Sequence, residues 1–204
     1  MAANATPNIG RLLVQLDDII PAIRRRIEVP LNMRLNRLHR VMQIVMGWED
    51  YHLYEFRIGR SIRYGEPDPD WDFPGSSSLP ANGASLGDLL TRIPGKSKKF
   101  TYVYDFGDDW RHTVKLETLI AAEAEVSYPR LISAERACPP EDVGGPLGYA
   151  NYLDAIGHPA HPRHTEMLEW RGEGFDPASV DVVAIQRSLD AFAKRSTRRS
   201  RAKS

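Results

Sequence analysis

Two short stretches of this 204-residue chain hold most of the side chains whose types could carry chemistry. The first stretch contains Asp105, Asp108, Asp109 and His112, and the second contains Cys138, Glu141 and Asp142. Carboxylate, imidazole and thiolate groups bind metal ions or transfer protons in enzymes. Because the two stretches are well separated in the sequence, they form one site only if the fold brings them together. These residues are the candidate site, and no catalytic role is assigned to any of them.

Each candidate also has a structural interpretation. Cys138 lacks a C-x-x-C partner, so a structural zinc site of the common spacing is not present. Asp108 and Asp109 are ordinary turn residues. His112 is favoured as a core histidine over a ligand or a general base. We therefore assign no metal ligands from the sequence and expect no cofactor.

The first stretch belongs to a segment, residues 99–117, that is predicted to be a β-hairpin. Alternation places its large apolar side chains and His112 on one face: Phe100, Tyr102, Tyr104 and Phe106 on the first strand, and Trp110, His112, Val114 and Leu116 on the second. A three-residue loop, 107–109, would pair Phe106 with Trp110 and Tyr104 with His112. In that register His112 points inward and Asp105 lies opposite Arg111.

The remaining pattern predicts a small α+β protein. Strands are expected over 11–16, 22–29 and 52–58, and a helix is expected to begin at Asn32 as N-cap and to end at Gly47. A long loop is expected over 65–84, followed by a short helix capped by Ser85. Further helices are expected after Pro146, after Pro162 and after residues 176–177. The predicted fold is a single α+β domain with an antiparallel or mixed sheet, an aromatic central hairpin and helices packed against the sheet.

Composition excludes few classes of protein. The chain has 27 basic and 27 acidic residues, so no global charge indicates nucleic acid or a membrane. Its single cysteine cannot form an intramolecular disulfide, and its first residues lack the apolar region of a signal peptide. We therefore expect a cytoplasmic protein with no membrane partner.

Positive charge is concentrated in two places. One is Arg24, Arg25 and Arg26 in a predicted strand, and the other is the tail with Arg198, Arg199 and Arg201. Both could contact nucleic acid through phosphates. Alternatively, the first is a solvated strand face with one arginine lying along the sheet, and the second is a disordered solubilising end. We expect a flexible N-terminus over 1–9, one domain over 10–193 and a basic disordered tail over 194–204.

Two long motifs and several shorter ones carry a family resemblance. The long motifs span Tyr104–His112 and Ala137–Tyr149, and the shorter ones are Pro21–Pro30, Leu38-His39, Gly47-Trp48 and His52-Leu53. From about Leu12 to Leu189 the chain resembles the plasmid pRiA4b ORF-3-like family. Arg24 is a departure, since members of that family usually carry tryptophan there.

The resemblance implies a small α+β domain found on plasmids and near transposable elements, mostly of uncharacterised activity, and it supplies no catalytic residues. It favours a non-enzymatic accessory or binding protein of mobile elements, with nucleic acid or an unknown protein as partner. One alternative is a metal-dependent or acid–base enzyme with a site around His112 and the Cys138 to Asp142 loop. Another is a protein-interaction module. The oligomeric state stays open.

Overall fold

Alternating apolar residues build one mixed sheet at the centre of the fold. The structure, a computed structural model, describes residues 6–66, 78–172 and 174–201. Within these residues eight strands follow the order β5-β4-β3-β6-β7-β1-β2-β8. All neighbours are antiparallel except β4 and β5, which run parallel. The bounds are β1 Ile9–Leu16, β2 Arg24–Pro30, β3 Tyr54–Ile58, β4 Ile62–Gly65, β5 Leu79–Pro80, β6 Lys99–Tyr104, β7 Trp110–Ile120 and β8 Arg130–Glu135. The predicted α+β class, with a central aromatic hairpin of β6 and β7, is confirmed.

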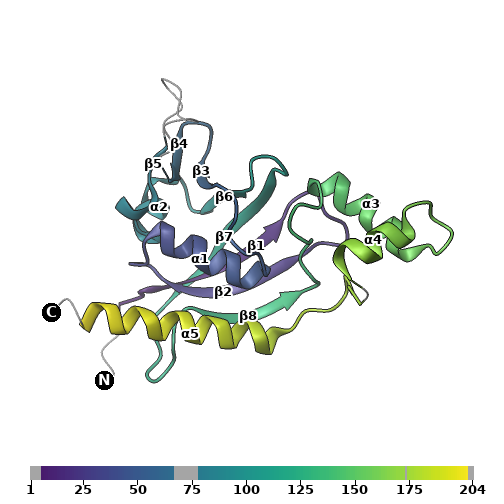
Figure 1. Cartoon of the computed structure of the whole chain (residues 1–204). Helices are drawn as coiled ribbons and strands as arrows, with labels where there is room; N and C mark the ends of the chain where they lie inside the picture. The colour runs from purple at the N-terminus through teal and green to yellow at the C-terminus, as the bar shows by residue number, and fades with distance from the viewer. Residues whose placement is uncertain (1–5, 67–77, 173, 202–204) are drawn as a thin grey trace.

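Some helices pack on the sheet, and others lie beyond one end of it (Figure 1). α1 (Leu35–Met46) packs its apolar stripe against the sheet, and α2 (Leu86–Arg92) lies near β4 and β5. α3 (Gly145–Gly157) and α4 (His164–Arg171) lie together at the opposite end, and α5 (Val182–Arg201) runs beside β8. A 3-10 turn, Ala81–Gly83, precedes α2. No helix in the described part of the chain is long and apolar enough to cross a membrane.

The predicted register of the central hairpin is wrong by two residues. Tyr104 pairs with Trp110 and Tyr102 with His112, so the loop spans 105–109 instead of 107–109. The reason is Asp105, which adopts the left-handed conformation at φ 55° and leaves the strand. Because the shift is even, the faces are unchanged, and His112 still points inward. Asp105 does not oppose Arg111, which pairs with Val103 across the strands.

Several element boundaries also differ from the predictions. α1 begins at Leu35 and has no side-chain cap, so the expected Asn32 cap is wrong, whereas the predicted end at Gly47 is confirmed. Ser85 caps α2 as predicted. The strand predicted over 52–58 begins only at Tyr54, and β4 and β8 were not predicted.

Two predicted irregular segments contain regular structure. The loop expected over 65–84 includes β5 and the 3-10 turn, while its residues 67–77 lie outside the described residues. α5 carries helical backbone to Arg201, and thus extends into the segment that we expected to be disordered from 194.

His112 is fully buried in the core. Its Nδ1 lies 3.2 Å from the carbonyl oxygen of Tyr102, and its ring meets that of Trp48 edge to face at 5.3 Å between centroids. Burial lowers the pKa of His112 to about 4. The imidazole is therefore neutral in the folded protein at pH 7.

We predict that His112 makes the folded state sensitive to acid. Between about pH 6.5 and pH 4 the unfolded chain binds a proton at this residue and the folded chain does not, so the unfolding free energy falls as the pH falls through this window. The contribution lost between pH 7 and pH 4.5 is about 2 kcal/mol. In His112→Leu, urea unfolding followed by tryptophan fluorescence should show a pH dependence weaker by that amount. The matched variant His158→Leu removes an exposed histidine as a control. A wild-type pH dependence in His112→Leu, or the same change of pH dependence in both variants, would contradict the prediction.

Candidate metal centre

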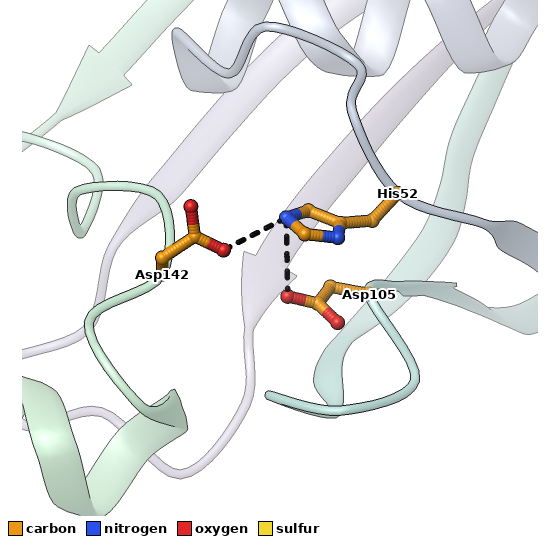
Figure 2. Close-up of side chains that lie close together, drawn as sticks. All are labelled: His52, Asp105 and Asp142. Carbon is orange, nitrogen blue, oxygen red and sulfur yellow. Dashed lines mark ion pairs between the residues drawn. The ribbon is translucent and has the colours of Figure 1, made fainter.

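Three side chains from separate parts of the chain converge on one point (Figure 2). His52 lies in the loop before β3, Asp105 directly follows β6, and Asp142 lies just before α3. His52 Nε2 is 3.0 Å from Asp142 Oδ1 and 3.6 Å from Asp105 Oδ2. One nitrogen and two carboxylate oxygens therefore face one another.

Asp105 is held in place by the turn that it creates. Its Oδ1 accepts hydrogen bonds from the backbone N–H groups of Gly107 at 2.9 Å and of Asp108 at 3.3 Å. Its own N–H donates to the carbonyl of Leu53 at 2.9 Å, which ties the end of β6 to the loop carrying His52. The residue is only 7% exposed. Because Oδ1 is engaged in the turn, the carboxylate is oriented with Oδ2 toward His52.

Close contact between two loops brings Asp142 to the same place. The Asp108 Oδ2 atom accepts a hydrogen bond of 3.0 Å from the Gly144 N–H. Gly145 sits at φ +68°, and a Cβ atom there would lie 2.5 Å from the carbonyl oxygen of Asp108. Only glycine permits this approach. The loop 105–109 and the segment 138–145 therefore form one structural unit.

Glu141 adds a third carboxylate beside the cluster. Its Oε1 accepts from the Glu49 N–H at 2.8 Å and from the Tyr104 hydroxyl at 3.0 Å. Burial, reinforced by Glu141, raises the pKa of Tyr104 well above its usual range, so the hydroxyl remains a donor. The Glu141 Oε2 atom is shielded from solvent, has no hydrogen-bond partner among the described residues, and lies 4.0 Å from His52 Nε2.

The cluster formed by His52, Asp105 and Asp142 has the dimensions of a small metal site. One ligand atom from each lies within 4.8 Å of the others. Ligands bound tetrahedrally at 2.0–2.1 Å from an ion are separated by about 3.3 Å, close to the two distances from His52. A mixed imidazole and carboxylate set suits Zn²⁺, Mn²⁺ or Fe²⁺. Ca²⁺ prefers six or more oxygen ligands and is not favoured.

The structure separates the other sequence-derived candidates from this cluster. His112 is enclosed in the core. Cys138 packs against the core, and desolvation raises the pKa of its thiol, which keeps it protonated. Asp109 pairs with Arg111 at 2.7 Å. Asp108 accepts the hydrogen bond from the Gly144 N–H that joins the two loops. The candidate enzyme site around His112 and Cys138 is therefore not assembled as expected, whereas Asp105, Glu141 and Asp142 do come together.

The arginines of β2 are engaged within the sheet. Arg25 is 1% exposed and donates to the carbonyl oxygens of Val45, Arg24 and Glu135. Arg24 bonds to Gln15 and Glu135, and Arg26 bonds to Glu117 through two nitrogens. These bonds support the structural interpretation of the arginine run. The side chains of Arg198, Arg199 and Arg201 lie outside the described residues.

Sequence reasoning missed His52. It was assigned to a strand with Tyr54 and Phe56, yet it lies before that strand and faces the two loops. The signal available was its place in a short motif, His52-Leu53, next to a strand end. Nothing local in the sequence indicates that this strand end adjoins Asp105.

Three comparisons relate the chain to known proteins. The family model described as plasmid pRiA4b ORF-3-like protein matches residues 8–184. The uncharacterized protein y4hQ of Sinorhizobium fredii is 41% identical over 197 residues, which cover 96% of this chain and 98% of that protein. The crystal structure of the protein of unknown function MM3350 from Methanosarcina mazei is similar with a TM-score of 0.74 and 32% identity, covering 86% of this chain and 96% of the other.

We predict that Gly145→Ala disrupts the contact between the two loops. The new Cβ would meet backbone atoms of Asp108, and the left-handed conformation penalises alanine, so the unfolding free energy should fall by about 2 kcal/mol. Gly157→Ala is the matched control, because a Cβ there has no atom within 4 Å. Thermal or urea unfolding measures both variants. Equal stability of the two would show that the contact does not depend on Gly145.

Proposed function

We propose that this chain, which belongs to the plasmid pRiA4b ORF-3-like protein family, binds a divalent transition-metal ion through His52, Asp105 and Asp142. We assign it the chemistry of metal-assisted hydrolysis. The observation that carries the proposal is the convergence of three ligand atoms from three loops within 4.8 Å. The alternative is a purely structural cluster in which His52 pairs directly with the two carboxylates.

Three protein ligands leave coordination positions open to water and substrate. A divalent ion lowers the pKa of bound water and polarises an ester, amide or phosphoryl group. Glu141 Oε2 is uncommitted to hydrogen bonds among the described residues and adjoins the ligands, so it is placed to accept the proton of the water. With an ion held by His52, Asp105 and Asp142, the site would supply a nucleophilic water for hydrolysis, and Glu141 would be placed to pass the proton that it accepts to the leaving group.

The direct test is a titration of chelator-treated protein with Zn²⁺ and with Mn²⁺ in a calorimeter. We expect one site per chain. His52→Ala, Asp105→Asn and Asp142→Asn should each weaken binding at least about tenfold, because the first removes a ligand and the other two replace a charged ligand with a neutral one.

Asp109→Asn is the matched control, since it makes the same chemical change in the same loop at a residue that pairs with Arg111. It should bind metal as the wild type does. Absence of stoichiometric binding, or binding unaffected by all three ligand variants, would refute the proposal. Circular dichroism spectra and unfolding curves of each variant distinguish a lost ligand from a lost fold.

Contact with nucleic acid, as an accessory protein of mobile elements, is a second and separate proposal. Its support is compositional: residues 194–204 carry Lys194, Arg195, Arg198, Arg199, Arg201 and Lys203 and no acidic residue. The helical backbone of α5 reaches Arg201, so residues 194–201 form the end of that helix. The paired arginines of β2 are not part of the proposal.

We predict that any such binding depends on the basic segment and on salt. DNA and RNA affinity should fall steeply between about 50 and 200 mM salt and should be lost on deletion of residues 194–204. Arg24→Ala and Arg26→Ala should leave the affinity unchanged. Fluorescence anisotropy with labelled duplex DNA and single-stranded RNA measures this, and no binding by the full chain at low salt would contradict it.

A further inference from the structure

A pocket of about 540 Å³ lies where the start of α1 and the second half of α5 meet the connection between β7 and β8. Arg34 and Arg37 line it from the start of α1, Ser127 and Tyr128 line it from the connection, and Lys194 lines it from α5. We call this recess the basic pocket. Three segments that are far apart in the sequence therefore share one recess in the surface.

The basic pocket is lined by cations without any carboxylate. Its charged residues are Arg34, Arg37 and Lys194, and none of the described residues that line it is aspartate or glutamate. By contrast, the pockets beside α4, at the end of α1 and beside α2 are each lined by at least one carboxylate residue. α1 also begins without a side-chain cap and with no acidic residue in its first turn, so the positive end of its dipole adds to the same field. The charges of the basic pocket therefore favour an anionic ligand.

Arg34 is the cation whose environment is best defined. It is exposed, and its Nη1 donates to the carbonyl oxygen of Gly83 at 3.1 Å. This partner is neutral, so the hydrogen bond orients the guanidinium group without cancelling its charge, and the other N–H groups of the fork can serve an anion. Hydrogen bonds from Ser85, with a smaller contribution from Arg34, lower the pKa of Asp88, but that carboxylate belongs to the cap of α2 and does not line the pocket.

The basic pocket is continuous with the end of α5. The guanidinium carbon of Arg37 lies 4.6 Å from the centre of the Phe192 ring, and this contact joins α1 to α5. Lys194 follows two residues later, and the helical backbone continues to Arg201. At 1.5 Å per residue, the interval 194–201 spans about 10 Å. Over this interval the sequence adds Arg195, Arg198, Arg199 and Arg201.

This distribution favours a ligand in which several phosphates are linked. A single free phosphate could occupy the pocket but would not extend along the helix. One strand of duplex DNA carries a charge about every 3.4 Å, so about 10 Å of helix matches about three successive phosphates. A membrane surface is less favoured, because none of the exposed large hydrophobic side chains in the described part of the chain lines the pocket and could enter a bilayer.

We infer that the basic pocket holds a phosphate group of a nucleic-acid backbone and that the interface continues from there along the end of α5. Contacts of this kind position the backbone and carry no base sequence information. The inference rests on the second proposed function, contact with nucleic acid, and deepens it. The interface begins between α1 and α5 and is not confined to the basic segment 194–204.

The test measures the affinity of the full chain for a fluorescein-labelled DNA duplex by anisotropy at several salt concentrations. Each phosphate contact contributes about 0.9 to the slope of log K against log salt. Arg34→Gln should therefore reduce the slope by about one and weaken binding about tenfold at about 50 mM salt. Arg34→Lys keeps the charge and should retain the wild-type slope.

Arg171→Gln is the matched control, because it makes the same change at an exposed arginine of α4, which lies at the other end of the sheet (Figure 1). It should keep the wild-type slope and affinity. A wild-type slope in Arg34→Gln, or an equal reduction in Arg171→Gln, would overturn the inference. If binding is still lost on deletion of residues 194–204 in that case, contact with nucleic acid stands without the pocket. No binding by the full chain at low salt would refute both.

A second measurement locates the interface without any variant. In two-dimensional amide NMR spectra of the full chain, the same duplex should shift the signals of Ser127 and Tyr128, which line the pocket but are far from α5 in the sequence. Shifts confined to α5, with the signals of these two residues unchanged, would overturn the inference.

Discussion

The close contact between the loop 105–109 and the segment 138–145 is the interaction on which the candidate centre depends. Gly145 lets its backbone approach Asp108, and the Gly144 N–H is bonded to the Asp108 carboxylate. Without this contact, Asp105 and Asp142 would belong to unrelated loops. With it, two short acidic turns become opposite sides of one cluster around His52.

Aromatic residues of the core hold the segment 138–145 in this contact. Tyr104 stacks on Trp48 at 4.9 Å between ring centroids, and its hydroxyl reaches Glu141. Trp48 in turn donates from Nε1 to the carbonyl oxygen of Pro139 at 3.0 Å. The segment that carries Glu141 and Asp142 is therefore bonded to a buried aromatic layer. Groups held by such a layer are preorganised, which favours ion binding over local rearrangement.

Local sequence patterns were sufficient for the fold class but not for the geometry of the site. Alternation identified the central hairpin and the inward face of His112, because side-chain direction depends only on the period of a strand. The register was wrong because Asp105 uses its carboxylate to form a turn, and this turn chemistry overrides extension of the strand. Asp105, Glu141 and Asp142 were named as candidates from their residue types alone.

The sequence did not indicate β8 or the position of His52, because both depend on contacts between distant segments of the chain. β8 was missed because it is a short edge strand whose burial comes from β2 and α5, not from alternation of its own residues. His52 was missed because its position relative to Asp105 depends on the pairing of β3 with β6. Ligand sets assembled from separate loops have no fixed sequence spacing, so only the three-dimensional arrangement reveals them.

The most direct measurement is the anomalous scattering of crystals grown with Zn²⁺, recorded on both sides of the zinc absorption edge. We expect one strong peak bounded by His52 Nε2, Asp105 Oδ2 and Asp142 Oδ1, at about 2.0–2.2 Å from each. A map with no peak at this position, and with His52 bonded directly to Asp142, would contradict it.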